Sequence, residues 1–316
     1  MKLHQTLMLN DGRTLGYADI GDPRHFPILY FHGFPGSRLE AAFAEYTIQQ
    51  CGVRVIAVER PGYGLSSHDP QRRISDWPND IRQLADALGL ARFSLLGVST
   101  GGVYALACAH ALPDRVHSTG IAGTLAPLHQ TEQLKAMDWL PRQAFKLVRD
   151  KPWLARLIIG QLCGSLIKYR PHWVVSSILP RLCESDQQAM FEVSFRREFT
   201  RSIQEAFRHG HVGPLYDLSL LSREWGFQPE DVHGPVHLWH GQGDSVIPVS
   251  MGRHLQARLP NCQSLFATSE GHLSIIVNYM KQALYTLSHG SAGHTTLTEA
   301  LQPDPQQLTD PLVLTM

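Results

Sequence analysis

The sequence predicts an α/β fold in which a mostly parallel sheet is interrupted by an all-helical insertion. Between residues 27 and 122, apolar runs of strand length alternate with helical patterns, which is typical of strand–helix–strand units. Residues 124–225 contain no buried-strand run, and their large apolar residues recur at helical spacing. The strand pattern resumes at residue 235. We therefore expect one α/β core in two parts, with a helical cap inserted between them.

The chain is expected to begin with an antiparallel hairpin. Residues 7–10 and 13–20 alternate around Asn10-Asp11-Gly12, which is a strong hairpin signal. Apolar runs at 27–31 and 53–58 predict the first two parallel strands, with a helical stretch between them.

Glycine and serine mark the next helix boundaries. Gly52 is expected to end the first helix as a C′ residue. Ser75 can cap the following helix, which stops at Gly89. A strand then begins at Phe93 and leads into a third helix, and residues 116–122 predict one more strand.

The insertion contains one prominent helical pattern. Ser185 and Gln188 have the spacing of a capping box. Behind them an apolar stripe recurs every four residues and consists of Phe191, Phe195, Phe199, Ile203 and Phe207. This pattern predicts one long amphipathic helix, which could either dock the insertion onto the core or roof an apolar pocket.

The second part of the core is expected to contain two strands, at 235–240 and 264–268, a helix between them at 249–259 and a last helix to about residue 287. The composition beyond it predicts a flexible tail. The expected segments are 1–123 and 227–288 for the core, 124–226 for the cap and 289–316 for the tail.

Ser99 is the candidate nucleophile. It lies in Gly97-Val98-Ser99-Thr100-Gly101, between an apolar strand and a helix of small residues, and this order is typical of a nucleophile elbow. So sharp a turn requires small residues two positions before and after the serine, as Gly97 and Gly101 provide. An isolated Gly-x-Ser-x-Gly arises by chance, so the hypothesis depends on partners elsewhere in the chain.

Asp244 and His272 are the expected partners. A serine hydroxyl needs a base in contact and a third group that orients the base. Both residues follow late strands, and the carboxyl ends of those strands are the edge to which the elbow also points. The alternative is that each residue merely caps the helix that follows it.

Four other residues are alternative candidates for these roles. His32 and His240 precede glycines at strand ends, where shaping a loop is the better interpretation. Glu270 is expected to point away from the site, and Asp231 is a weaker candidate for the acid.

An acyl-transfer site also needs donors for the developing oxyanion. The residue after the nucleophile presents its backbone N–H at a helix start, which here is Thr100. The second N–H is expected from Phe34, in the loop after the early strand.

Charge, histidine spacing and cysteine usage weigh against several classes of partner and site. The chain has 28 basic and 28 acidic residues without long runs of either sign, which weighs against nucleic acid or an anionic membrane as the main partner. The 17 histidines are scattered and none has the spacing of a zinc site. The five cysteines are unclustered, and Cys51, Cys108 and Cys262 are interpreted as small buried hydrophobic residues rather than as members of disulfides. No signal peptide or membrane span is visible, so a cytoplasmic location is expected.

Five motifs carry a resemblance to a known family, and they are His32-Gly33-Phe34-Pro35-Gly36-Ser37-Arg38, Glu59-Arg60-Pro61-Gly62-Tyr63-Gly64-Leu65-Ser66, Gly97-Val98-Ser99-Thr100-Gly101-Gly102, Trp239-His240-Gly241-Gln242-Gly243-Asp244 and Glu270-Gly271-His272-Leu273. Together they resemble the α/β-hydrolase superfamily over nearly the whole chain except the tail. The resemblance implies an eight-stranded sheet, a variable cap after the sixth strand and a cofactor-free Ser-Asp-His hydrolase.

The chain departs from parts of this family. Glu59 stands where the family usually has Asp. The loop from His32 resembles those of epoxide hydrolases and dehalogenases, which carry an aspartate nucleophile where Ser99 stands. The proline iminopeptidase group resembles a different pattern, with a His-Gly-Gly-Pro-Gly loop and a Gly-Gly-Ser-Trp-Gly elbow. This chain has neither motif, which weakens the interpretation as a proline iminopeptidase.

We therefore expect a hydrolase of small to medium, fairly apolar carboxylic esters that acts as a monomer or homodimer on a small-molecule substrate. A thioesterase, lactonase or amidase would use the same mechanism. A small-molecule receptor with slow hydrolysis is the alternative from another class, and a scaffold with a dead site fits less well because every triad position is filled.

Overall fold

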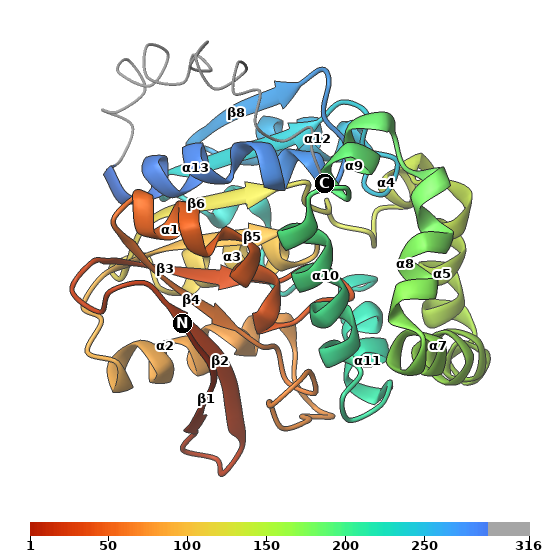
Figure 1. Ribbon diagram of the computed structural model, residues 1–316, viewed down its shortest axis with the longest axis horizontal. Helices are drawn as coiled ribbons and strands as arrows, with labels where there is room; N and C mark the ends of the chain where they lie inside the picture. The colour runs from red at the N-terminus through yellow and green to blue at the C-terminus, as the bar shows by residue number, and fades with distance from the viewer. Residues whose placement is uncertain (290–316) are drawn as a thin grey trace, which may run out of the picture.

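Eight strands form one sheet in the computed structural model, which describes residues 1–289 (Figure 1). The strands are β1 (Lys2–Met8), β2 (Thr14–Ile20), β3 (Phe26–Phe31), β4 (Val53–Val58), β5 (Phe93–Val98), β6 (Val116–Ala122), β7 (Val236–Gly241) and β8 (Cys262–Ala267). Their order in the sheet is β1-β2-β4-β3-β5-β6-β7-β8. The pairs β1–β2 and β2–β4 are antiparallel, and every other pair is parallel. The predicted fold class is confirmed.

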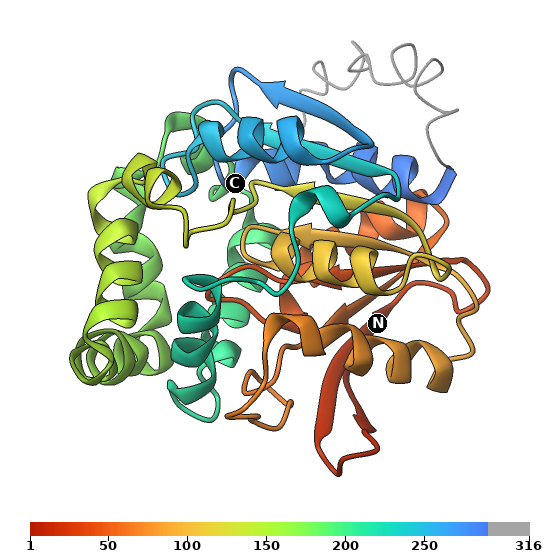
Figure 2. The same cartoon turned by 180° about the vertical axis from the view of Figure 1, so that it is seen from behind.

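Helices cover the two faces of this sheet. On one face lie the 3₁₀-helix η1 (Arg38–Ala44), α1 (Glu45–Gln50) and α13 (Ser274–His289), and on the other lie η2 (Ile74–Asp76), α2 (Trp77–Ala87), α3 (Gly101–Ala111), η5 (Pro229–Asp231) and α12 (Val249–Arg258). Figures 1 and 2 show these two layers from opposite sides. The central strands β4 and β5 are buried at every position, because both of their faces are covered.

The insertion between β6 and β7 is helical throughout. It consists of α4 (Thr131–Ala136), α5 (Trp139–Asp150), α6 (Pro152–Ala155), the π-helix η3 (Arg156–Cys163), α7 (Gly164–Tyr169), α8 (Pro171–Ile178), η4 (Leu179–Arg181), α9 (Glu184–Ala189), α10 (Val193–Ala206) and α11 (Val212–Leu221). It follows β6 directly and lies beside the carboxyl end of that strand (Figure 1). We refer to this insertion as the cap.

Two predicted helix starts are wrong. Ser75 lies inside η2, and the capping side chain there is Asp76, whose carboxylate accepts a hydrogen bond from the Arg73 amide at 2.8 Å. The capping box at Ser185 and the single long helix behind it are also absent. Instead α9 and α10 are separate helices, because the chain turns where Met190 is buried and Phe191 is 73% exposed.

Three further expectations concern single features. All five cysteines are free thiols; Cys108 is buried, while Cys51 and Cys262 are half-buried. Within residues 1–289, no helix is long and apolar enough to cross a membrane. The predicted tail lies, apart from its first residue, outside the described residues.

Candidate active site

Ser99 sits at the tip of the turn between β5 and α3. Its φ is +55°, a left-handed conformation that is strained for any residue with a side chain, and its amide donates to the Ala122 carbonyl at 2.8 Å. A Cβ at Gly97 would lie 2.5 Å from the Gly101 carbonyl oxygen, and one at Gly101 would lie 2.1 Å from the Phe31 oxygen. The close approach that the sequence predicts is therefore present at these two glycines.

His272 lies between the other two candidate residues. Its Nε2 is 3.0 Å from the Ser99 hydroxyl oxygen, and its Nδ1 is 2.7 Å from Asp244 Oδ2. All three side chains are buried. The structure thus brings together the three residues that the sequence selects, from three turns that follow β5, β7 and β8.

Asp244 is held in place by its own turn. Its Oδ1 accepts hydrogen bonds from the amides of Val246 and Ile247, at 2.8 and 2.7 Å. Its Oδ2 is the oxygen that faces His272. One carboxylate oxygen therefore organises the loop while the other orients the imidazole, so the capping alternative and the orienting role are compatible.

Opposing effects set the protonation of His272. Burial lowers the pKa of His272, but its contact with Asp244 and the nearby charge of Asp186 outweigh burial and raise the pKa above its ordinary value. The environment therefore stabilises the imidazolium form, which is the form that exists after a proton leaves Ser99.

The loop after β3 runs close beside Ser99. A Cβ at Gly33 would lie only 3.2 Å from the Ser99 Cβ, so the next residue, Phe34, is placed at the rim of the site. Arg60 fixes this loop, since its guanidinium donates to the carbonyls of His32 and Gly33 at 2.5 and 3.0 Å. The Gly33 carbonyl and the Phe34 N–H belong to one planar trans peptide group and point in opposite directions, so the Phe34 N–H points away from Arg60.

The other histidines have different partners. His32 Nδ1 is 2.8 Å from the Gly33 carbonyl, and its Nε2 accepts from the Arg60 amide at 3.4 Å. His240 Nε2 is 2.9 Å from the Ile247 carbonyl and 3.5 Å from Asp244 Oδ2, so His240 lies behind Asp244 rather than beside Ser99. Burial lowers the pKa of both imidazoles. These contacts fit the predicted loop-shaping roles.

The alternative acids also lie elsewhere. Glu270 accepts from Asn278 at 3.0 and 3.1 Å and so faces α13. Asp231 accepts from the Gln228 amide at 2.8 Å and caps η5.

A cavity of about 170 Å³ opens beside Ser99 and His272. Its walls are almost entirely apolar. Its lining includes Phe34, Phe43, Val98 and Val246 from the core and Ile178, Leu182, Phe195 and Phe199 from the cap. Phe195 and Phe199 belong to the predicted stripe, so part of that stripe does roof a pocket. Glu40 supplies the one carboxyl in this lining, and it accepts from the Tyr30 hydroxyl at 2.7 Å.

Sequence reasoning missed Asp186, a fully buried carboxylate of α9. It accepts three backbone hydrogen bonds at the start of α13, from the amides of His272, Leu273 and Ser274 at 2.9, 2.8 and 2.8 Å. A carboxylate of the cap therefore satisfies the first amides of the core helix α13 and holds the loop of His272. A Cβ at Gly271 would lie 2.5 Å from the Asp186 Cγ, so this contact also explains the glycine in the Glu-Gly-His turn.

A second missed carboxylate, Asp217 of α11, holds Arg60. It accepts from Arg60 Nε at 3.0 Å, from Arg72 at 2.8 Å, and from the hydroxyls of Tyr63 and Tyr104. Burial opposes its charge, yet Arg60 and Arg72 keep the pKa of Asp217 below its ordinary value. The cap thus reaches the loop beside Ser99 through Arg60.

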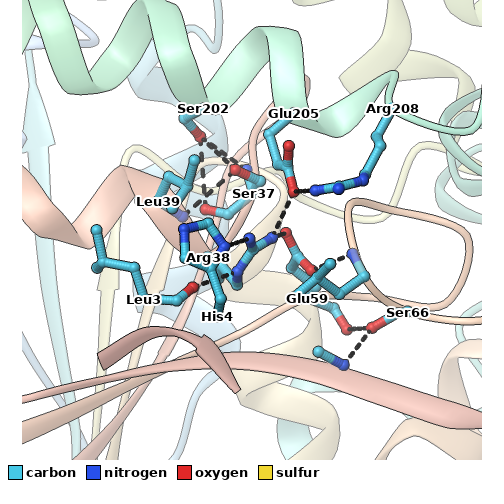
Figure 3. A network of polar contacts seen from close by, with 12 residues as sticks. Leu3, His4, Ser37, Arg38, Leu39, Glu59, Ser66, Ser202, Glu205 and Arg208 are labelled. Carbon is cyan, nitrogen blue, oxygen red and sulfur yellow. Dashed lines mark hydrogen bonds and ion pairs between the residues drawn. The ribbon is translucent and has the colours of Figure 1, made fainter. Parts of the chain in front are cut away.

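A third contact between cap and core is centred on Arg38 (Figure 3). This fully buried guanidinium contacts Glu59 at 2.5 Å and Glu205 of α10 at 2.8 Å. It also donates to the Leu3 carbonyl at 2.6 Å and lies 2.7 Å from His4 Nδ1. Glu59 thus occupies the position where the family usually has the shorter Asp and pairs with Arg38 from there.

Within residues 1–289, no three His, Cys, Asp or Glu side chains are grouped so that they could hold a metal ion.

Comparisons with known proteins agree with this architecture. The family model described as alpha/beta hydrolase fold matches residues 27–279. A bifunctional epoxide hydrolase 2 from Sus scrofa is 21% identical over 85% of this chain, which spans about half (52%) of that protein. A putative proline iminopeptidase from Mycoplasma pneumoniae is 24% identical, with 84% of this chain and 91% of that protein covered. The structure of an esterase from Exiguobacterium antarcticum has a TM-score of 0.66 at 19% identity, covering 90% of this chain and 97% of that one.

Proposed function

The chain belongs to the α/β-hydrolase fold family, and from this premise we propose that it is a serine hydrolase of small to medium, fairly apolar carboxylic esters. One observation carries the proposal: Ser99, His272 and Asp244 form a continuous chain of contacts of 3.0 and 2.7 Å that ends in an apolar cavity. This arrangement suits a nucleophile, its base and the group that orients the base.

In the proposed reaction, His272 Nε2 takes the proton of the Ser99 hydroxyl as Oγ attacks the ester carbonyl carbon. The carbonyl electrons move to its oxygen, and the backbone amides of Phe34 and Thr100 donate to that oxyanion. The intermediate collapses, the bond to the alcohol oxygen breaks, and His272 gives its proton to the departing oxygen. Water, deprotonated by His272, then attacks the carbonyl carbon of the acyl-enzyme. The bond from that carbon to Ser99 Oγ breaks, His272 returns the proton to Oγ, and the carboxylic acid leaves.

The cavity supports an uncharged substrate. At about 170 Å³ it is smaller than the roughly 300–1,000 Å³ typical of sites for drug-sized ligands, so it suits a short acyl or alcohol part. A peptidase that requires a free amino terminus needs a carboxylate to hold the ammonium group. Burial raises the pKa of Glu40, the one carboxyl in the described lining, and so disfavours its charged form. This favours esters over amino-terminal peptides.

The test compares wild type with Ser99→Ala on p-nitrophenyl acetate, butyrate and palmitate, with prolyl p-nitroanilide, a thioester and a lactone as further substrates. We expect fastest turnover of the short p-nitrophenyl esters and a loss of about 10⁴-fold or more in Ser99→Ala. Labelling by a fluorophosphonate at Ser99 verifies that the nucleophile is reactive. Wild-type activity in Ser99→Ala would refute the assignment, and tight binding of a small molecule with negligible turnover would favour the receptor alternative.

A further inference from the structure

The helices of the cap that lie farthest from the sheet form a distinct layer. It runs from Trp139 to Arg181 and contains α5, α6, η3, α7, α8 and η4; we call it the outer cap layer. Figures 1 and 2 show α5 and its neighbours at one edge of the molecule, with α10 and α11 between them and the sheet. Within residues 1–289, one side of the outer cap layer is therefore left without a packing partner.

Large apolar side chains are concentrated on this layer. Within residues 1–289 it holds nine of the fifteen large hydrophobic side chains that are exposed, which are Trp139, Leu140, Trp153, Leu157, Ile158, Leu162, Leu166, Tyr169 and Trp173. Trp153, Leu162 and Trp173 are 69%, 59% and 62% exposed. Scattered exposed hydrophobics need no explanation, but such a concentration marks an interaction surface.

The pattern follows the helix geometry. Residues 152–169 form one continuous helical stretch, in which Ile158, Leu162, Leu166 and Tyr169 follow one another at intervals of four, four and three residues. This spacing places the four side chains along one side of the stretch. The exposed residues therefore form a stripe.

Basic residues accompany the apolar ones. Residues 139–181 contain eight Lys and Arg but one acid, Asp150, which is paired with Arg149 at 2.8 Å. The rest of the chain consequently has 20 basic and 27 acidic residues. The balanced total of 28 against 28 thus conceals a strong segregation of charge. Lys151, Arg156 and Arg170 are exposed on this layer.

A cavity borders the outer cap layer. It has a volume of about 510 Å³ and lies between Val148 and residues 152–156 of the layer on one side and α11 with the loop of His68 on the other, and none of the proposed site residues lines it. Trp153, Val148 and Leu215 form apolar walls, and Arg156 borders the cavity. An apolar hollow next to a guanidinium suits an acyl chain whose headgroup carries negative charge.

We propose that the outer cap layer docks onto the surface of an anionic lipid bilayer. Trp and Tyr are favoured at the level of the headgroups, aliphatic side chains enter the acyl boundary, and Lys and Arg contact anionic lipids. A symmetric dimer through this layer would place two cation-rich surfaces against each other. The aliphatic stripe is equally unsuited to nucleic acid, whose backbone is recognised by cationic and polar groups. This proposal differs from the expectation drawn from net charge alone, because the charge of residues 139–181 is far from balanced.

Docking would bring lipid close to the catalytic cavity, because Ile178 at the end of α8 belongs to the layer and lines that cavity. The proposal is nevertheless independent of ester hydrolysis, since binding is measured without turnover. Ser99→Ala should bind vesicles as wild type does, whatever the substrate proves to be.

The test is cosedimentation of the full chain with vesicles of phosphatidylcholine alone or with 30% phosphatidylserine. We expect partitioning onto the phosphatidylserine vesicles that weakens as salt increases. The triple variant Lys151→Glu, Arg156→Glu and Arg170→Glu should bind about a hundredfold more weakly or worse, given the contribution of each cationic side chain near an anionic leaflet. Arg92→Glu, at an exposed position outside the cap, is the matched control and should bind as wild type does.

A second variant tests the apolar stripe. Trp153→Ser, Leu162→Ser and Trp173→Ser together should reduce binding at least tenfold even at low salt, while Met8→Ser with Tyr46→Ser, which are 67% and 71% exposed elsewhere, should not. Thermal melts verify that each variant is folded. Equal sedimentation with both vesicle types, unchanged binding of the charge variant, or a stable dimer in solution that is broken by the Ser triple variant would overturn the proposal.

Discussion

Asp186→Asn offers the sharpest test of how the cap contributes to the proposed site. In wild type, Asp186 Oδ2 faces the His272 amide, and Oδ1 faces the amides of Leu273 and Ser274. The asparagine oxygen can keep the two bonds of Oδ1, but its NH₂ group then meets the His272 N–H, donor against donor. The substitution therefore loosens the backbone of the residue that must contact Ser99, while the start of α13 stays capped.

The size of the effect follows from that one contact. A hydrogen bond to a charged group contributes about 1.5 to 3 kcal/mol, and a rate or equilibrium constant changes tenfold for about every 1.4 kcal/mol. If the whole loss appears as misplacement of His272, kcat/KM for a p-nitrophenyl ester falls by about tenfold to a hundredfold. The lost negative charge also lowers the pKa of His272, because Asp186 is one of the groups that raise it. The acid limb of the pH profile should therefore move to lower pH.

The assay is kcat/KM against pH for wild type, Asp186→Asn and Glu184→Gln. Glu184 lies on the same helix but is exposed and pairs only within α9, at 3.3 Å from Gln188, so its variant should match wild type. A purely structural role for Asp186 would lower the melting temperature without moving the acid limb. An unchanged kcat/KM together with an unmoved acid limb would refute the positioning role.

Three other outcomes are expected. Because the pKa of His272 is raised and the base must be neutral, kcat/KM should rise with pH, with a midpoint above the ordinary histidine pKa of about 6.5. The stability that protonated His272 contributes to the fold is full below that value and is lost as the pH rises through the same midpoint. A midpoint of the activity profile below pH 6 would contradict this. Gly101→Ala should reduce kcat/KM about a hundredfold or more, since its Cβ would lie 2.1 Å from the Phe31 carbonyl oxygen. Gly234→Ala, which has open space around it, is the control and should keep the wild-type kcat/KM. Equal kcat/KM values for the two variants would count against the elbow geometry. Arg38→Met should lower the free energy of unfolding by about 3 to 5 kcal/mol in urea titrations, because it leaves Glu59 buried without its cation, and a change under about 1 kcal/mol would exclude this role.

The sheet and the proposed site could be predicted because their signals are local. Each central strand is an apolar run bounded by turn residues, and Ser99 has its glycines within two positions. The spacing of His272 and Asp244 from their strands is equally short, so a strand prediction also placed these side chains at one edge. The parallel sheet then brings Ser99 and His272 together, although they are 173 positions apart in the sequence.

The carboxylates of the cap could not be found in this way. Asp186, Asp217 and Glu205 contact core residues that lie 86, 157 and 167 positions away, and no turn or period relates the partners. One signal was available for Asp217, which is the single charged residue in the apolar helix α11 and must therefore be paired if buried. For Asp186 the local sequence misleads, because it lies inside the predicted Ser185 capping box yet caps a different helix.

These three carboxylates change what the cap is expected to do. Each comes from a different cap helix and reaches a different part of the core. Asp186 reaches the loop of His272, Asp217 reaches Arg60, which holds the loop beside Ser99, and Glu205 reaches Arg38 at the start of η1. Separating Asp217 or Glu205 from its arginine is costly, because a buried charge left alone is uncompensated in the interior. Moving Asp186 away would leave its buried carboxylate without the three backbone donors that it contacts. A cap held at these points cannot lift as a rigid lid without disturbing the residues proposed for catalysis. Entry to the cavity is therefore expected through local movement of apolar side chains such as Ile178 and Leu182, at the end of the cap where the outer layer meets the site.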